Sequence, residues 1–171
     1  MRADAVEEFT AYVAACSPRM RRTAFLMCGD WQKAEDEVQT ALVKLYLSWD
    51  RVRARQSLDS FVRTTLVRAL IDERRRPWRR EQSRAVVPDR ATAASMAVED
   101  RLTVRAALAR VPQRQRAVLV LRFYDDCDVA ETARMIGCSE GTVKSQTARG
   151  LARLRELLAI CEPSSADCSE G

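Results

Sequence analysis

The sequence predicts an all-α protein in which two small helical domains are joined by a flexible linker. Apolar residues recur at three- and four-residue steps through most of the 171 residues, which is the spacing of one helix face. This pattern is lost in a polar, Ala- and Arg-rich stretch, residues 81–95, that is typical of a linker. We therefore expect one domain over residues 1–80, a second over 96–160, and a polar, disordered tail over 161–171.

The first domain is expected to begin with a helix in two parts. Residues 4–15 form an amphipathic segment with acidic residues in the first turn, where the helix dipole favours negative charge. Ser17 then caps a restarted helix that has Pro18 at its first position. This second part continues to Gly29, which ends it.

Two more helices complete the first domain. Asp30 has the side chain of an N-cap and begins a long amphipathic helix. Residues 50–57 break the apolar period, so we expect a loop there. Ser57 or Asp59 caps the fourth helix, which Pro77 ends because proline cannot continue the hydrogen-bond ladder.

The second domain begins with two helices. One starts near Ala97, and the other has Pro112 at its first position. The run Ala117–Leu121 is apolar on every side. We therefore expect this helix to lie at the centre of the second domain.

Residues 128–158 have the pattern of a helix-turn-helix. A short periodic segment is followed by Gly137, which takes a positive φ at no steric cost, and by Ser139, which can cap a second helix. The positions expected to face inward are Val129, Ala130, Ala133, Ile136, Val143, Thr147, Gly150, Leu151, Leu154 and Leu158. The outer face of the second helix is polar and cationic, which favours insertion in the DNA major groove over a helical hairpin with a merely solvated face.

The charge distribution also indicates an anionic partner. The net charge is +5, and the segment Arg74–Arg84 holds six Arg and one Glu, a surplus equal to that of the whole chain. No apolar run approaches the length of a membrane span, and no leader pattern precedes a cleavage site. We expect a cytoplasmic protein that does not bind membranes.

The cysteine pattern argues against a metal site. The chain has six Cys and no His, and no two cysteines have the CxxC spacing. We expect reduced thiols, no metal, no cofactor and no enzymatic activity. Cys161 and Cys168 in the tail are the one pair placed to act as a redox switch.

Both halves of the chain resemble one family. The segment VEDRLTVRAALARVPQRQRAVLVLRFYDDCDVAETARMIGCSEGTVKSQTARGLARLRELL closely resembles region 4 of bacterial sigma factors. The segments AEDEVQTALVKLYLSWDRV and SFVRTTLVRALIDERRR resemble their region 2. The resemblance covers about residues 5–160, and it is closest to the extracytoplasmic-function (ECF) group, in particular its SigE-like actinobacterial subgroup.

The resemblance implies that the protein binds core RNA polymerase, recognises the −35 and −10 promoter elements and helps to open the duplex. The β′ coiled coil of the polymerase would dock on Glu35, Asp36 and Gln39, and region 4 would contact the β flap. The positions matching −35 contacts are Ser139, Thr142, Lys144, Ser145, Gln146, Ala148 and Arg149. Those matching −10 contacts are Arg51, Arg53, Arg55, Gln56, Phe61, Thr64, Thr65 and Arg68, and those along the duplex phosphates are Arg74, Arg75, Arg76, Arg79 and Arg80.

One of these positions departs from the family pattern. Arg68 stands where the family commonly has Asn, and Arg prefers guanine or phosphate geometry, so the −10 sequence of relatives cannot be carried over. In the other half, Gln146 can pair bidentately with adenine, and Arg149 with guanine or a phosphate. Free members of the family usually keep their DNA faces masked, often by an anti-sigma factor, which is therefore a candidate partner.

Two other functions stay open on the residues alone. A helix-turn-helix regulator could bind operators as a dimer without polymerase, but it would have no need for the pattern of residues 30–76. An enzyme or redox sensor would require chemistry that no His, metal-ligand spacing or phosphate-binding loop of this chain supplies.

Overall fold

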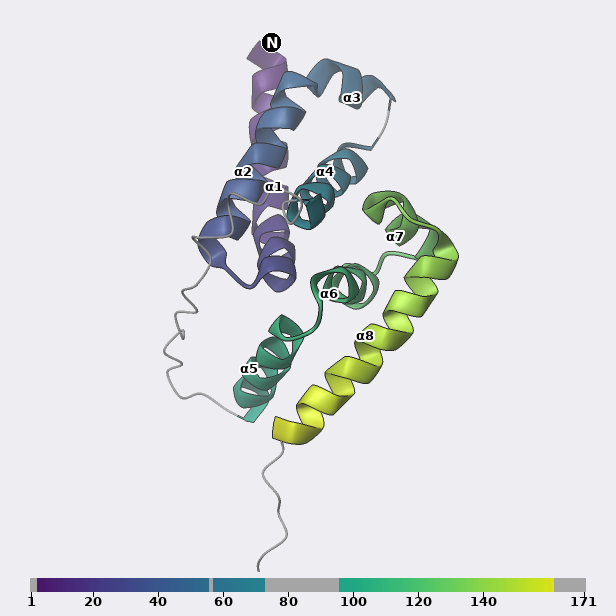
Figure 1. Ribbon diagram of the computed structural model, residues 1–171. Helices are drawn as coiled ribbons and strands as arrows, with labels where there is room; N and C mark the ends of the chain where they lie inside the picture. The colour runs from purple at the N-terminus through teal and green to yellow at the C-terminus, as the bar shows by residue number, and fades with distance from the viewer. Residues whose placement is uncertain (1–2, 56, 73–95, 162–171) are drawn as a thin grey trace, which may run out of the picture.

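The computed structural model describes residues 3–55, 57–72 and 96–161, and this part of the chain contains helices and no strand. The elements are α1 (Ala3–Cys28), α2 (Trp31–Leu47), α3 (Trp49–Arg55), α4 (Leu58–Asp72), α5 (Met96–Ala109), α6 (Gln113–Leu119), the π-helical turn η3 (Val120–Tyr124), α7 (Val129–Ile136) and α8 (Glu140–Cys161). Figure 1 shows α1–α4 as one bundle, with α5–α8 as a second group beside it. The all-α prediction is confirmed. The expected linker, and residues 162–171 of the expected tail, lie outside the described residues.

The turn between α1 and α2 forms as its residues predict. Gly29 has a φ of 79°, which a residue without Cβ adopts freely. The side chain of Asp30 accepts a hydrogen bond from the backbone N–H of Lys33 at 3.1 Å, so the predicted N-cap is confirmed. This cap places α2 alongside α1, and the two helices supply much of the core of the bundle.

The predicted break at Ser17–Pro18 is wrong, because α1 runs through Pro18 without interruption. The hydroxyl of Ser17 donates to the carbonyl of Val13 at 2.6 Å instead of capping a new helix. Proline removes one hydrogen bond, but buried residues on both sides of it, Ala5 and Met20, belong to the same core cluster. Burying both halves on one core keeps the helix in one piece.

The predicted loop over residues 50–57 is also wrong for most of its length. Residues 49–55 form α3, while residue 56 lies outside the described part. Trp49 and Val52 lie three positions apart and are both buried, so α3 turns one narrow apolar face to the bundle. Two apolar positions are too few for a period to be detected in the sequence.

The segment predicted to lie at the centre of the second domain, Ala117–Leu121, does lie at the centre of the second group of helices. All five residues of Ala117–Leu121 are buried, which confirms the prediction. Pro112 is the N-cap of α6 and not its first helical residue, with φ −53° and ψ 138°. Its carbonyl accepts from the N–H of Arg116 at 2.9 Å, so the helix begins one residue later than expected.

The two groups of helices pack against each other and share a core. The largest buried cluster joins residues of α1, α2 and α4 to Ala117 and Leu121 of the second group and to Met135 of α7. Helix α7 therefore lies between α4 on one side and α6 and α8 on the other (Figure 1). For this reason the single inward face predicted for α7 is wrong: Ala130 is exposed, whereas Thr132 and Met135 are buried.

Candidate nucleic-acid interface

The helix-turn-helix is built by three local features, of which the sequence predicts the turn at Gly137 and the cap at Ser139. Asp128 caps α7 by accepting from the N–H of Glu131 at 2.6 Å. Gly137 then reverses the chain with φ 76° and ψ 48°, as expected for a C-terminal glycine. The hydroxyl of Ser139 accepts from the N–H of Thr142 at 3.2 Å, which confirms the predicted cap of α8.

The N-terminal half of α8 presents a polar face to solvent. Six of its exposed residues and the half-buried Gln146 are those matched to −35 contacts, with Ser139 and Thr142 at the start of the helix and Lys144, Ser145, Ala148 and Arg149 along it. Two hydroxyls bond locally: Ser139 lies 2.9 Å from the hydroxyl of Thr142, and Ser145 donates to the carbonyl of Thr142 at 3.0 Å. The structure thus brings this predicted set together on one exposed surface.

The opposite face of α8 is fixed against the centre of the domain. Val143 is fully buried in a cluster with Val118 and Ala133, and Leu157 in a cluster with Leu119. Leu157 is a core residue that the sequence analysis left out of the inward stripe. These contacts hold the exposed face of α8 in a defined orientation, as a reading surface requires.

The residues matched to −10 contacts are divided among several environments. Arg51 donates to the hydroxyl of Ser48 at 3.3 Å, and Arg53 is paired with Glu8 on α1. On α4, the residues Phe61, Thr64 and Thr65 are half-buried, and Thr65 donates to the carbonyl of Phe61 at 2.8 Å. Gln56, the side chain of Arg55 and the arginines at 74, 75, 76, 79 and 80 lie outside the described residues.

Arg68, the last of the −10 set, is engaged by the other half of the molecule. Its Nε donates to the carbonyl of Met135 at 3.3 Å, and its Nη2 donates to the carbonyl of Arg134 at 3.2 Å. Both carbonyls lie in the last turn of α7, where backbone oxygens have no partner within the helix. The guanidinium that the sequence assigns to DNA therefore caps a helix of the second domain.

The face of α2 that matches the polymerase contact is partly free. Asp36 and Gln39 are exposed, and Asp36 receives one weak hydrogen bond from Gln32 at 3.4 Å. Glu35 is instead paired with Arg21 of α1 at 2.6 Å. Two of the three predicted residues thus present acceptor groups to solvent.

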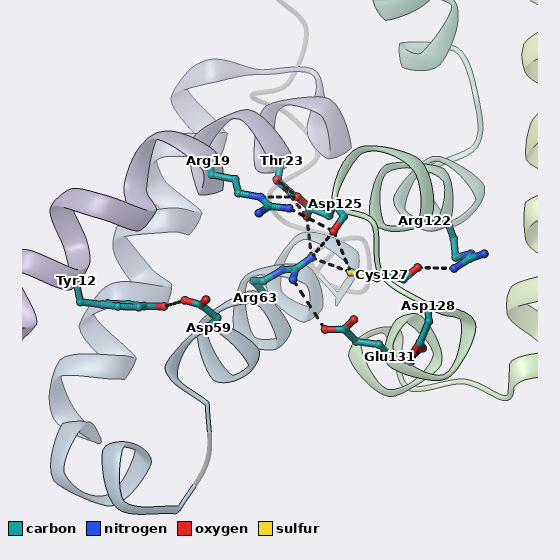
Figure 2. A network of polar contacts seen from close by, with 10 residues as sticks. All are labelled: Tyr12, Arg19, Thr23, Asp59, Arg63, Arg122, Asp125, Cys127, Asp128 and Glu131. Atoms are coloured by element: carbon teal, nitrogen blue, oxygen red, sulfur yellow. Dashed lines mark hydrogen bonds and ion pairs between the residues drawn. The ribbon is translucent and has the colours of Figure 1, made fainter.

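A polar network that the sequence analysis missed joins the two halves (Figure 2). At its centre, the carboxylate of Asp125 accepts from Arg19 Nε at 3.2 Å and from Thr23 Oγ1 at 3.1 Å, and Arg63 Nη2 lies 3.4 Å from it. The backbone carbonyl of Asp125 accepts from Arg19 and Arg63 as well, at 3.3 and 3.4 Å. Only 3% of the Asp125 side chain is exposed. Nothing in the sequence identifies the distant partners of Asp125.

Cys127 adds a second contact to the same network. Its thiol lies 2.7 Å from Arg63 Nη2, and its carbonyl accepts from Arg122. Burial raises the pKa of the Cys127 thiol to about 11, although the nearby Arg63 acts in the opposite direction. Burial also raises the pKa of the other thiols for which a direction is known, those of Cys16, Cys28 and Cys138. Because the thiolate is the reactive form, these groups are poorly suited to redox chemistry at neutral pH. The side chains of Cys161 and Cys168 lie outside the described residues.

A membrane span needs a long apolar helix, and none of the described helices meets that requirement.

Comparison with known proteins agrees with this arrangement. The family model "Sigma-70 region 2" matches residues 12–80, and "Sigma-70, region 4" matches residues 101–154. An RNA polymerase sigma-E factor of Streptomyces avermitilis is 35% identical over 158 residues, covering 90% of this chain and 86% of that protein. The ECF RNA polymerase sigma factor SigM of Mycobacterium tuberculosis is 33% identical over 144 residues, covering 82% and 71%.

A solved structure shares the fold. The sigma factor RpoE from Bartonella quintana, in complex with the anti-sigma factor NepR, aligns with a TM-score of 0.70 at 24% identity, covering 91% of this chain and 99% of that one. The two family models fall on the two helical groups described above, in the order of region 2 and then region 4. The chain therefore belongs to the ECF group of the sigma-70 family, whose members bind core RNA polymerase and direct transcription initiation at promoters.

Proposed function

We propose that the chain binds core RNA polymerase through the outer face of α2, reads the −35 element with α8, and reads the −10 element with α3 and α4. The observation that carries this assignment is that α2 and α8 lie on opposite sides of the molecule (Figure 1) and that each helix carries exposed polar residues. One face could hold polymerase while the other lies against DNA, as two simultaneous partners require. The chain would catalyse nothing itself, and it would act in the cytoplasm.

The −35 assignment is supported by the geometry of α8. Its first turn offers backbone N–H groups and the positive end of the helix dipole to a phosphate. Lys144 and Arg149 add exposed positive charge, and Gln146 can pair with adenine. Each base contact would contribute about 1–3 kcal/mol to recognition.

The polymerase assignment is supported by the acceptors of α2. Asp36 and Gln39 are exposed one helical turn apart, so they present a negative and a hydrogen-bonding group side by side. A basic coiled coil such as that of the β′ subunit would complement this face and would be steered to it by charge. The β flap would contact region 4.

An anti-sigma factor is a further proposed partner. The related RpoE was solved with such a protein, and its fold matches nearly the whole of this chain. A binding protein that covers α2 or α8 would block polymerase or DNA without any change in the chain itself.

A run-off transcription assay with core polymerase tests the proposal. Native templates are chosen by mapping transcription start sites after the protein is overexpressed. We expect specific transcripts only when core enzyme and this chain are both present. Absence of promoter-specific initiation on every mapped template would refute the proposal.

The alternative of an operator-binding regulator leaves the region 2 match without a role. Size-exclusion chromatography separates the two functions, because a sigma factor elutes with core polymerase in the absence of DNA. A regulator of the alternative kind would elute alone and would still bind duplex DNA.

A further inference from the structure

Helix α3, part of the surface proposed to read the −10 element, has a narrow apolar face with which to hold its place. It is seven residues long, and its buried residues are Trp49 and Val52. A helix of this length is not stable alone in water, so its neighbours must fix its position. Side chains that recognise a ligand must be held to within about half an ångström of the productive geometry. The contacts that hold α3 therefore determine how well this surface can discriminate between bases.

The first half of α1 supplies two such contacts. The ring of Phe9 packs edge-on against the ring of Trp49, with centroids 5.3 Å apart and an interplanar angle of 86°. The preceding residue, Glu8, forms an ion pair with Arg53. Trp49 and Arg53 lie one helical turn apart on α3. Helix α1 thus holds α3 at two points, one apolar and one charged.

Tyr12, one turn after Glu8, connects α3 to α4. Its ring lies 6.2 Å from the ring of Trp49, at the start of α3. Its hydroxyl donates to Oδ1 of Asp59, in the first turn of α4, at 2.7 Å (Figure 2). Burial raises the pKa of the Tyr12 hydroxyl far above its ordinary value, and the hydrogen bond to Asp59 acts in the same direction, so the group stays protonated and remains a donor. One side chain therefore links the starts of the two helices proposed to read the −10 element.

The ion pair with Glu8 also changes the role expected of Arg53, which the sequence matches to a −10 contact. The side chains of Arg53 and Glu8 are 48% and 53% exposed, so the pair lies at the surface. A DNA phosphate would have to displace the carboxylate of Glu8 before it could bind this guanidinium. Arg51, by contrast, donates to the neutral hydroxyl of Ser48 at 3.3 Å. Arg51 is thus the better placed of the two to bind a phosphate.

We propose that Glu8 and Tyr12 are positioning residues of the −10 reading surface, which act through Arg53 and Asp59 to hold α3 and α4 in the arrangement that recognises DNA. This inference deepens the proposed function and rests on it for the recognition step. Helix α1 would then determine −10 selectivity through residues that do not touch DNA. Polar pairs at the surface contribute little to folding, so their loss should affect recognition more than unfolding.

Two conservative variants of the full-length chain remove the contacts. Tyr12→Phe deletes the hydroxyl and keeps the ring against Trp49, and Glu8→Gln removes the charge and keeps the length of the side chain. Two controls make the same chemical changes at exposed positions elsewhere. They are Tyr124→Phe in η3 and Glu7→Gln, next to Glu8 on α1.

Hydrogen–deuterium exchange of the free chain is the first measurement, and it uses neither DNA nor polymerase. Loss of a contact should let α3 and the start of α4 open more often, so amides of residues 49–55 and 58–62 should exchange faster. We expect an increase of about two- to tenfold for Tyr12→Phe, the range for one hydrogen bond. The increase for Glu8→Gln should be up to about fivefold, the range for an exposed ion pair. The controls should exchange like the wild type, and unchanged exchange in both test variants would overturn the proposal.

Selectivity for the −10 element is the second measurement. The chain bound to core polymerase is titrated with a fluorescent non-template strand that carries a mapped native −10 element, and with the same strand after the element is scrambled. Both test variants should lower the ratio of the two affinities by the factors given above, with the Tm changed by less than about 4 °C. Faster exchange with an unchanged ratio would show a merely structural role and would also overturn the proposal. If the wild type itself showed no preference for the native strand, the proposed function would fail instead, whatever the exchange rates.

The dependence of binding on salt separates positioning from direct contact. Loss of one phosphate contact to a single strand lowers the slope of log K against log salt concentration by about 0.7. We expect this change for Arg51→Gln, whereas Arg53→Gln should keep the wild-type slope and lower the selectivity ratio as Glu8→Gln does. The charge-reversed pair, Glu8→Arg with Arg53→Glu, should recover most of the ratio because the ion pair is restored. A reduced slope for Arg53→Gln, or no recovery in the reversed pair, would show that Arg53 binds DNA directly and would contradict the role of Glu8.

Discussion

Replacing Gly150 with alanine is expected to destabilise the protein, although this change normally strengthens a helix. Gly150 is buried where α8 crosses α6. A Cβ atom at this position would lie 3.1 Å from both Cγ and Cδ1 of Leu119 and 3.3 Å from Cβ of Gln115. Carbon atoms in good contact are about 3.5–4.0 Å apart, so α8 or Leu119 would have to move by roughly half an ångström.

The size of the effect follows from two opposing contributions. Alanine is more favourable than glycine inside a helix by about 1 kcal/mol. Overpacking a well-filled core costs about 1–3 kcal/mol, and Leu119 has little room because it is buried in a cluster with Leu157. The net change for Gly150→Ala is therefore a destabilisation of about 0–2 kcal/mol.

Gly141 in the same helix is the matched control. A Cβ atom there would meet only the hydroxyl of Ser139, at 3.9 Å, which is an ordinary contact. Gly141→Ala should therefore be stabilising, by up to about 1 kcal/mol. The two variants should differ by the overpacking contribution, about 1–3 kcal/mol.

Thermal unfolding followed by circular dichroism measures this difference. For a chain of this size, a change of about 1 kcal/mol moves the Tm by roughly 2–4 °C. Gly141→Ala should therefore unfold above the wild type, and Gly150→Ala at or below it. If Gly150→Ala raised the Tm as much as Gly141→Ala, the close crossing of α6 and α8 would be wrong, and with it the orientation of the proposed reading surface.

Three further results are expected. Arg149→Ala should weaken binding to a native promoter in gel-shift titrations by roughly 5- to 150-fold, the range for one base contact. The exposed Arg153→Ala should not, and equal losses would contradict the −35 assignment. Asp36→Ala should slow association with core polymerase by up to about fivefold, an effect that salt suppresses, whereas the exposed Glu7→Ala on α1 should not change the rate. Because burial raises the pKa of Cys127 to about 11, the unfolded thiol ionises first as the pH rises. Stability measured by urea unfolding should then be unaffected below about pH 8.5 and fall towards pH 11. The Cys127→Ser variant should show a flatter pH dependence over this range, and an identical slope would contradict the burial of the thiol.

The features predicted correctly from the sequence are those that depend on neighbouring residues. The caps formed by Asp30 and Ser139 and the left-handed turn at Gly137 each involve atoms within one helical turn. The apolar run Ala117–Leu121 is central because no face of that helix could lie in water. In all these cases the physical cause lies in the same short segment as its effect.

The features that were missed depend on residues far apart in the chain. Helix α1 passes Pro18 because both of its halves pack on one core, and α3 forms because Trp49 and Val52 are buried by other helices. The Asp125 network joins the start of the chain to the turn before α7. The sequence around Asp125 identifies neither of its distant arginines, Arg19 and Arg63. In the same way, the sequence around Arg68 gives no sign that α7 engages it, so this residue was matched only to DNA.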